Sequence, residues 1–301
     1  MQNFGQKSYQ TPKVIAEIGC NHKGDFDIAK ELILLAKTCG AHVAKFQKRT
    51  PKELLTKEQY EAPHPVAYNS YGDTYGAHRE FLEFSQEQHQ QLKAYCDEIG
   101  IEYSTSVWDV TSAREIIAIN PSFIKVPSAC NNHFEMLKVL RDEYQGEVHI
   151  SFGMTTKEEE NDIISFFEET GAAKDRLVVY SCTSGYPVPF TDVCLLEITR
   201  LYQEHENRVK AIGFSGHHLG IAIDIAAYTL GAQWIERHFT KDRTWKGTDH
   251  AASLEPFGIQ KLVRDLKATH SALAYKPQDI LEIETVQRNK LKYQPAKERV
   301  S

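Results

Sequence analysis

Short apolar runs rich in β-branched residues recur along the chain and alternate with longer stretches of helical period. Short apolar runs bounded by turn residues are typical of buried strands in a parallel sheet. Because strands that alternate with helices build parallel sheets, the pattern predicts an α/β fold. The predicted strands cover residues 14–18, 42–46, 102–106, 123–126, 148–152, 177–182, 209–214 and 234–239. The clearest predicted helices cover residues 26–38, 156–169, 192–206, 221–230 and 256–274.

The number of repeats favours a barrel. Eight strand–helix repeats within 301 residues predict a single-domain (β/α)8 TIM barrel, with a doubly wound open sheet as the alternative. We place this barrel at residues 13–276, after an N-terminal extension at 1–12. A short charged C-terminal tail at 277–301 follows, and we expect it either to form a helix packed on the barrel or to fray.

The connection after the second predicted strand is unusually long. Residues 61–79 form a polar insertion rich in tyrosine, glycine, histidine and proline. A loop of this length in a compact domain usually covers a site or is disordered. The sequence therefore leaves two alternatives for this long loop, a lid over a site or a disordered excursion.

Charge and cysteine content narrow the class of protein. A net charge of −6 without a stripe of lysine and arginine argues against nucleic acid as a partner. No apolar run approaches the roughly 20 residues that span a bilayer, so we expect no membrane segment. The first residues are polar and lack the apolar core of a secretory signal peptide. The cysteines form no CxxC motif, so we expect reduced thiols in a cytoplasmic protein.

Two histidines follow the last two predicted strands. His217 comes just after the seventh run, and His238 lies at the end of the eighth. If these strands are parallel neighbours, both imidazoles emerge at one end of the sheet, where they can share a divalent metal. A lone histidine at a strand end is usually structural, but two of them together with Glu17 and Asp249 on other loops make a metal site an equal alternative.

Lysines and hydroxyl groups also gather at predicted strand ends. Lys45 and Lys125 lie inside apolar runs, where an amine must be paired. Together with several serines they indicate an anion site for phosphate and carboxylate. A snorkelling amine and a Schiff-base lysine remain alternatives. Cys130 and Cys182 also follow strands, but without a clear histidine partner we expect them to pack as apolar side chains.

These residues sit in motifs that resemble those of the sialic acid (N-acetylneuraminate) synthase family. The resemblance runs in order from residue 14 to residue 273. It implies a barrel that condenses phosphoenolpyruvate with an open-chain hexose, giving a nine-carbon 2-keto sugar acid and phosphate for surface glycan biosynthesis. The motifs are Ala16-Glu17-Ile18-Gly19-Cys20-Asn21-His22-Lys23-Gly24, Lys45-Phe46-Gln47, Ser104-Thr105, Lys125-Val126-Pro127-Ser128, Ser151-Phe152-Gly153-Met154, Cys182-Thr183-Ser184-Gly185-Tyr186-Pro187 and Glu236-Arg237-His238-Phe239-Thr240.

The resemblance also implies roles for individual residues. His217 and His238 would hold a divalent metal, expected to be Mn²⁺ with Mg²⁺ or Co²⁺ as alternatives, and Glu17 and Asp249 would bind its waters; these four would be catalytic. A metal ion polarises the acceptor aldehyde as a Lewis acid. Phosphoenolpyruvate would be bound by Lys45, Thr105, Lys125, Ser128, Ser151 and Ser215. The sugar would contact Gln47, Ser184, Tyr186 and Glu236.

Several positions depart from the family pattern. Family members usually continue into an antifreeze-like C-terminal domain, which completes the active site of the partner subunit. This sequence stops near the linker to that domain. A homodimer is therefore a hypothesis that rests on the resemblance alone. Ser184 stands where asparagine is common, and the segment after the fourth strand, residues 127–130, lacks a frequent glutamate. We therefore expect an intact phosphoenolpyruvate half and an altered sugar half, suited to a modified amino or deoxy hexose.

The sequence is also compatible with two other functions. One is an eight-carbon ulosonate synthase that takes a pentose phosphate. That acceptor would require an additional cluster of phosphate-binding arginine or lysine near the insertion, where Arg79 is the obvious candidate. The other is a non-catalytic sugar-binding barrel, suggested by the missing C-terminal domain.

Overall fold

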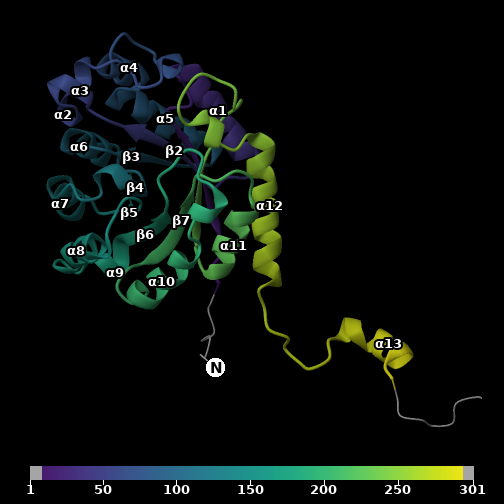
Figure 1. Cartoon of the computed structure of the whole chain (residues 1–301). Coiled ribbons are helices and arrows are strands. Elements are labelled where there is room, and N and C mark those ends of the chain that lie inside the picture. The colour runs from purple at the N-terminus through teal and green to yellow at the C-terminus, as the bar shows by residue number, and fades with distance from the viewer. Residues whose placement is uncertain (1–8, 294–301) are drawn as a thin grey trace, which may run out of the picture.

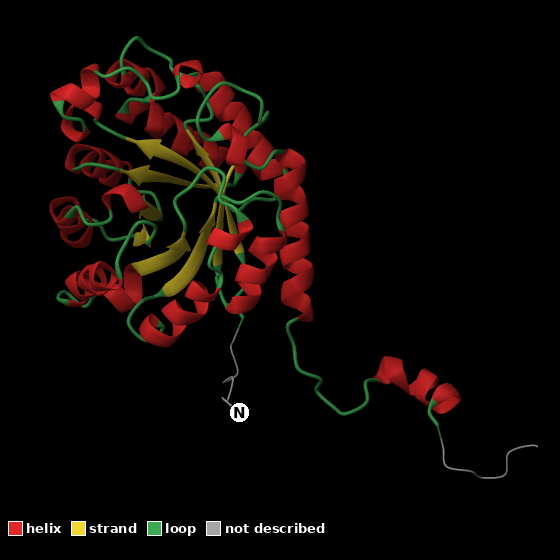
Figure 2. Ribbon diagram, viewed as in Figure 1, coloured by secondary structure: helices red, strands yellow, loops and turns green. Residues whose placement is uncertain are grey.

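The predicted strands pair side by side in chain order and close on themselves. The structure, a computed structural model that describes residues 9–293, contains a closed barrel of eight parallel strands in which β8 pairs with β1. Figure 2 shows the strands at the centre with helices around them. The TIM barrel is confirmed, and the doubly wound alternative is wrong. The strands are β1 Lys13–Gly19, β2 Val43–Lys48, β3 Glu102–Val107, β4 Phe123–Val126, β5 Glu147–Ser151, β6 Leu177–Cys182, β7 Ala211–Gly216 and β8 Trp234–His238.

An outer ring of helices covers the barrel, and local capping residues explain where several begin. Thr156 and Glu159 form a capping box at the start of α8, and Ser85 and Gln88 form another at α5. The helix α5 ends at Gly100 in the left-handed conformation. The ring consists of α1 Phe26–Thr38, α5 Gln86–Ile99, α6 Val110–Ile119, α7 Phe134–Glu143, α8 Lys157–Glu168, α9 Ala172–Arg176, α10 Leu196–His205, α11 Ala222–Leu230 and α12 Pro256–Ala272 (Figure 1).

Alternation along the strands divides the barrel interior into an apolar and a polar part. Towards the amino ends of the strands, the inward side chains form a packed apolar plug. Two residues further along β1, β2, β4 and β8 the inward position is charged, because side chains at i and i+2 share a face. Lys45 follows Val43 in this way, and Glu236 follows Trp234. The plug is formed by Ile15, Val43, Phe123, Val178, Tyr180, Ala211 and Trp234.

The long insertion after β2 is folded rather than disordered. The crossover contains α2 Pro51–Leu54, α3 Lys57–Glu61 and α4 Tyr75–Leu82, with a 3₁₀ turn at Ala67–Asn69. Two hydrogen bonds join it to the loop after β8. The Tyr71 hydroxyl donates to the Lys246 carbonyl at 2.5 Å, and the Gly247 N–H donates to Asn69 Oδ1 at 3.3 Å. The insertion therefore forms part of the wall at the mouth of the barrel.

The tail contains a helix that stands apart from the barrel. The helix α13, Glu282–Leu291, has no buried residue and lies away from the body of the molecule in Figure 1. An ion pair of 2.7 Å joins Lys276 to Glu284 within the tail. The sequence correctly allowed a helix here, but packing on the barrel was wrong. Residues 1–8 of the expected extension and 294–301 of the expected tail lie outside the described residues. None of the helices in the described part is long and apolar enough to cross a bilayer.

Candidate active site

A cavity of about 600 Å³ opens at the carboxyl ends of the barrel strands. That volume is in the range of pockets that enclose small-molecule ligands. Every residue of the predicted site except Thr105 lines this cavity. In a TIM barrel this end carries the chemistry, since the loops that follow the strands meet there.

Two lysines and two glutamates form the floor of the cavity. Lys125 Nζ lies 3.2 Å from both carboxylate oxygens of Glu236. Lys45 Nζ lies 2.5 Å from Glu17 Oε2 and 3.5 Å from Glu236 Oε2. All four side chains are buried. Because each ammonium has a carboxylate partner, the free-energy cost of burying these charges is offset. The ammonium groups do not reach solvent, so the interpretation of these lysines as snorkelling side chains is wrong.

The pairing shifts the pKa values of these groups. Burial alone would raise the pKa of Glu236, but the charges of Lys125 and Lys45 hold it well below its ordinary value. Burial lowers the pKa of Lys125, which has less carboxylate nearby than Lys45. Burial raises the pKa of Glu17, which Lys45 opposes. Glu17 is therefore the carboxyl group of the floor that is closest to taking up a proton.

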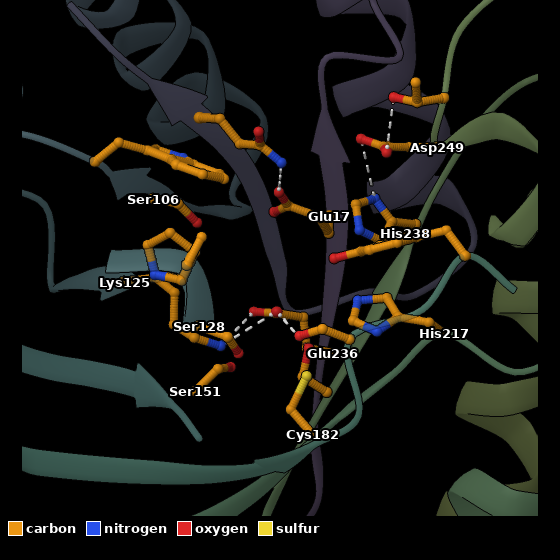
Figure 3. Close-up of a pocket in the computed structure, with 18 of the residues that line it drawn as sticks. Glu17, Ser106, Lys125, Ser128, Ser151, Cys182, His217, Glu236, His238 and Asp249 are labelled. Carbon is orange, nitrogen blue, oxygen red and sulfur yellow. Dashed lines mark hydrogen bonds and ion pairs between the residues drawn. The ribbon is translucent and has the colours of Figure 1, made fainter. Parts of the chain in front are cut away.

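Hydroxyl groups surround this floor. Ser215 Oγ donates to Glu236 Oε1 at 3.0 Å, and Ser128 Oγ accepts a hydrogen bond of 3.0 Å from the Gly153 N–H. Figure 3 shows Lys125, Ser128 and Ser151 on one side of the cavity, with Glu236 beside them. A cation ringed by hydroxyl donors is suited to phosphate or carboxylate oxygens.

Thr105 does not reach the cavity. Ser104 and Ser106 point into the barrel, where Ser106 Oγ accepts a hydrogen bond of 2.7 Å from Lys45 Nζ. Thr105 lies between them and so faces the surrounding helices, since successive side chains of a strand alternate. The expected placement of Thr105 at the anion site was therefore wrong, and Ser106 lines the cavity in its place.

His217 and His238 meet at the same end of the barrel, as the parallel pairing of β7 with β8 predicts. Their ring centres lie 5.4 Å apart. Two imidazoles that bind one ion at about 2.1 Å with a tetrahedral angle have ring centres about 5 Å apart. The spacing therefore fits a shared metal ion (Figure 3).

The hydrogen bonds of the two rings also suit metal binding. His217 Nδ1 lies 3.0 Å from the Thr183 carbonyl, which can only accept, so Nδ1 carries the proton and the Nε2 lone pair is available. Burial lowers the pKa of His238 to about 4, so this ring is neutral near pH 7. Its Nδ1 has no hydrogen-bond partner among the described residues, and Asp249 Oδ2 lies 3.9 Å away. A bound cation would satisfy both groups.

A second group of potential metal ligands lies outside the barrel. Among the described residues, one set of three histidine, cysteine or acidic side chains has its ligand atoms within 4.8 Å of one another: Glu160 of α8 with Glu204 and His205 of α10. Both of these carboxylates pair with Arg200, at 2.9 and 2.7 Å. The guanidinium already neutralises them, so we assign no metal to this group.

Cys182 was expected to pack as an apolar residue, but it lines the cavity beside His217. Burial alone would raise the pKa of this thiol. The neighbouring His217 and the charge of Lys125 more than offset burial and lower the pKa of the thiol, while Cys182 in turn raises the pKa of His217. The position at the end of β6 was the available signal. Its histidine partner could not be read from the sequence because it comes from another strand.

The outer part of the cavity is built from loops. Tyr186 packs against both imidazoles, with ring centres 4.3 Å from His217 and 5.8 Å from His238. Gln47 Nε2 donates to Glu17 Oε1 at 2.8 Å. The lining residues that the sequence did not single out for the site are mostly on loops, and these are Arg49, Val66, Asn69, Trp108, Pro127, Ala129, Met154 and Thr248.

One glycine is required where β1 approaches β2. Gly19 has a φ of +55°, and a Cβ there would lie 2.9 Å from Gln47 Nε2 and 3.2 Å from Glu17 Oε1. The pairing of β1 with β2 is also irregular between Glu17 and Gly19. Any side chain at this position would displace Gln47 from Glu17.

Comparison with known proteins places the chain in a family. Residues 32–278 match the model of the NeuB family. The chain is 38% identical over 278 residues to the N-acetylneuraminate-9-phosphate synthase of Homo sapiens, covering 92% of this chain and 76% of that protein. It is 31% identical over 277 residues to the N,N'-diacetyllegionaminic acid synthase of Legionella pneumophila, covering 90% of this chain and 77% of that protein.

A solved structure agrees with these matches. The N-acetylneuraminic acid synthetase of Leptospira borgpetersenii, crystallised with citrate, superposes with a TM-score of 0.79 at 26% identity, covering 95% of this chain and 94% of that one. The match to the longer relatives falls on their barrel region. The chain therefore belongs to the NeuB family of metal-dependent, phosphoenolpyruvate-condensing transferases that make sialic and other nonulosonic acids.

Proposed function

We propose that this chain condenses phosphoenolpyruvate with an open-chain hexose resembling N-acetylmannosamine, or a modified amino or deoxy hexose, giving a nine-carbon 2-keto sugar acid and phosphate for surface glycan biosynthesis. One observation carries the proposal. The same cavity contains two features. One is a floor with two lysines surrounded by serine hydroxyl groups, and the other is a pair of imidazoles whose lone pairs are available. The barrel, residues 13–276, is the unit to which we assign the activity.

Phosphoenolpyruvate is assigned to the floor. Its phosphate and carboxylate carry negative charge that Lys45 and Lys125 can neutralise, and Ser128, Ser151 and Ser215 supply hydroxyl donors. Ser106 takes the place that Thr105 was expected to fill. These groups hold the substrate so that the enol C3 can reach the acceptor aldehyde, with the orientation fixed by the rigid strand ends.

The metal is assigned to His217 and His238, with Asp249, 3.9 Å from His238, and Glu17, the register partner of His238 on β1, as the carboxylates for its waters. When bound, the cation supplies Lewis-acid polarisation of the aldehyde oxygen. We expect Mn²⁺, with Mg²⁺ or Co²⁺ as alternatives, because imidazole and carboxylate ligands accept all three ions.

The reaction forms the bond between the enol C3 and the aldehyde carbon, adds water at C2, and then breaks the C2–O bond to phosphate. Lys45 and Lys125 stabilise the negative charge on the departing phosphate. Glu17, whose pKa is raised by burial, is assigned to hold the proton exchanged with water at C2. Gln47, which donates to Glu17, orients this carboxyl group.

The acceptor sugar is assigned to the outer part of the cavity. Ser184 and Tyr186 lie after β6, while Gln47 on β2 and Glu236 on β8, which is part of the floor, line the same cavity. The relatives are named for different nonulosonic acids, among them a 9-phosphate of N-acetylneuraminate in the human protein and N,N'-diacetyllegionaminic acid in the Legionella protein. Their names therefore support a nine-carbon product and leave its substituents open.

The experiment is release of inorganic phosphate from phosphoenolpyruvate in the presence of Mn²⁺ and single acceptors. Phosphate release that requires both substrates, stops with a chelator and is lost in His217→Ala supports the proposal. Release with arabinose 5-phosphate in place of every hexose would favour the eight-carbon alternative. Sugar binding by calorimetry without turnover of any acceptor would favour the non-catalytic barrel and contradict the proposal.

A further inference from the structure

The ammonium group of Lys125 lies against the face of an aromatic ring. Its Nζ is 3.6 Å from the centre of the Tyr180 ring, and both side chains are buried. Lys45 pairs with two carboxylates, Glu17 and Glu236, but across residues 9–293 Lys125 pairs with Glu236 alone. The ring quadrupole attracts a cation most strongly where water is excluded. The Tyr180 ring is therefore the second stabilising contact of this ammonium.

The ring of Tyr180 is held by its neighbours inside the barrel. Its hydroxyl lies 2.8 Å from His149 Nδ1. On β7 the residue beside it is Gly213, where a Cβ would lie 2.5 Å from Tyr180 Cε1. His149 is itself stacked on Phe123, with ring centres 4.0 Å apart, and packs edge-on against Trp234 at 4.8 Å. Such close packing leaves the Tyr180 ring little freedom to move or turn.

A chain of polar contacts continues from Tyr180 to the amino end of β5. His149 Nε2 lies 3.0 Å from Glu147 Oε2, and Lys210 Nζ lies 2.8 Å from the other oxygen of that carboxylate. Burial would raise the pKa of Glu147, but hydrogen bonds with His149 and Lys210 lower it to about 2. Burial lowers the pKa of His149 to about 4. Near pH 7 a neutral imidazole therefore faces a carboxylate.

These charge states set the direction of the hydrogen bonds. The carboxylate of Glu147 can only accept, so His149 Nε2 carries the proton and donates it. His149 Nδ1 then has the lone pair and accepts from the Tyr180 hydroxyl. Hydrogen bonds in such a chain polarise one another, and a phenol that donates gains electron density in its ring. The ring face towards Lys125 is therefore more negative than that of a tyrosine without an acceptor.

We propose that Tyr180 is a positioning residue that holds the ammonium of Lys125 in place for phosphoenolpyruvate, and that Glu147 strengthens this contact through His149. The inference rests on the proposed function, in which Lys125 binds this substrate. Phosphoenolpyruvate has to share the ammonium with Glu236. A carboxylate cancels the charge that it stabilises, whereas a neutral ring does not. The ring therefore keeps Lys125 in position and leaves its charge to the substrate.

The experiment changes the electron density of the ring but not its shape. Tyr180 is replaced by phenylalanine and by mono-, di- and trifluorophenylalanine in the Mn²⁺-loaded full chain, and calorimetry gives Kd of phosphoenolpyruvate. The four rings all lack the hydroxyl and pack alike, but each fluorine weakens the attraction of the ring face for a cation. A role in packing alone predicts one Kd for all four.

We expect Kd to rise with each fluorine, by about 10-fold between phenylalanine and trifluorophenylalanine, which is the scale of a desolvated cation–π contact. KM of phosphoenolpyruvate should follow Kd, and kcat should stay nearly constant. Glu147→Gln leaves the ring intact but removes the charge at the far end of the chain. It should raise Kd by about 2-fold, and an unchanged Kd would overturn the part assigned to Glu147.

Tyr103 provides a matched control. It is a buried tyrosine whose hydroxyl lies 2.7 Å from Nδ1 of a buried histidine, His89. It faces the helices, because Ser104, the next residue of β3, points into the barrel. Phenylalanine and its fluorinated analogues at position 103 should leave Kd of phosphoenolpyruvate unchanged.

The outcomes distinguish this inference from the proposed function. One Kd across the series at Tyr180, or an equal rise across the series at Tyr103, would overturn the inference, while turnover of a hexose would leave the proposed function standing. A graded Kd without turnover of any hexose would support the inference and contradict the proposed function. If the wild-type chain does not bind phosphoenolpyruvate, both fail.

Discussion

Lys125 on β4 and Glu236 on β8 pair across the full width of the barrel, with Lys125 Nζ 3.2 Å from both oxygens of the carboxylate. The two strands are four positions apart in the ring, the largest separation that eight strands allow. Lys125 Nζ also lies 3.6 Å from the centre of the Tyr180 ring. This ion pair therefore spans the floor of the cavity. An anionic substrate that binds there has to share the ammonium group of Lys125 with Glu236.

The first prediction concerns this ion pair between Lys125 and Glu236. Glu236→Gln should lower the free energy of unfolding by roughly 3 kcal/mol, since it leaves Lys125 without its charge partner in a buried site. Phosphoenolpyruvate restores negative charge there, so it should raise Tm of the variant more than Tm of wild type, measured by calorimetry. Asp224→Asn, which leaves the buried Arg237 unpaired outside the cavity, is the matched control and should show no such additional effect. An equal or smaller rise in Glu236→Gln would contradict the assignment of the floor.

The second prediction concerns the metal. His238→Ala should reduce bound Mn²⁺, measured by metal analysis after dialysis, from about one ion per chain to none, and circular dichroism should stay unchanged. Glu204→Gln alters the alternative ligand group on α10 and should keep the wild-type metal content. Retained metal in His238→Ala together with loss in Glu204→Gln would reverse the two assignments.

The third prediction concerns a buried ion pair outside the cavity. Arg237 Nη1 donates to Asp224 Oδ2 at 2.5 Å and to His218 Nε2 at 3.0 Å, and all three side chains are buried. Asp224→Asn should lower the free energy of unfolding in urea by about 3–5 kcal/mol, because the charge of Arg237 stays buried without compensation. Asp97→Asn, in an exposed pair with Lys93, should change it by less than about 1 kcal/mol. Similar effects from both variants would refute this account.

The fourth prediction concerns acid stability. His89 is buried, its Nδ1 lies 2.7 Å from the Tyr103 hydroxyl, and burial lowers its pKa to about 3. The unfolded chain takes up this proton near the ordinary pKa of about 6.5, so between these values the unfolded state binds more protons. Stability should therefore fall as the pH drops from 6.5 towards 3, with a contribution of roughly 1.4 kcal/mol per pH unit from this group.

Urea unfolding of wild type and His89→Gln at pH 7, 6, 5 and 4 measures that contribution. The variant is expected to be less stable at pH 7, because it loses packing against Phe84, but its free energy of unfolding should decline less steeply with acid. Identical slopes at constant m-value would show that His89 is not a source of the acid sensitivity.

The strands and the polar end of the barrel could be predicted because both follow from local rules. Each strand begins and ends within two residues of its predicted bounds, since the apolar runs are short and well separated. The meeting of His217 with His238 follows from the parallel pairing of consecutive strands. Thr105 shows the limit of this reasoning. Alternation along β3 turns its side chain outward, and Ser106 lines the cavity instead.

The loop-built end of the cavity could not be predicted in the same way. The helix α4 begins after Thr74, whose side chain accepts a hydrogen bond from the Ala77 N–H, but its position depends on contacts with α2 and α3. The hydrogen bond between Tyr71 and Lys246 joins residues 175 positions apart. No local pattern signals such a contact. Arg79 was recognised as a phosphate candidate, but the hydrogen bonds that its guanidinium donates to the Tyr75 hydroxyl required coordinates.

The connection between the insertion and the loop after β8 has an evolutionary consequence. Because Asn69 and Tyr71 bind the second loop through its backbone, at Gly247 N and the Lys246 carbonyl, these two hydrogen bonds do not depend on the side chains of that loop, although position 247 itself requires glycine. Both segments lie beyond the strand ends that carry the lysines of the floor. A lineage could exchange this pair of loops together, with Asp249 kept, and so acquire a new sugar preference while the barrel beneath continues to activate the same three-carbon donor.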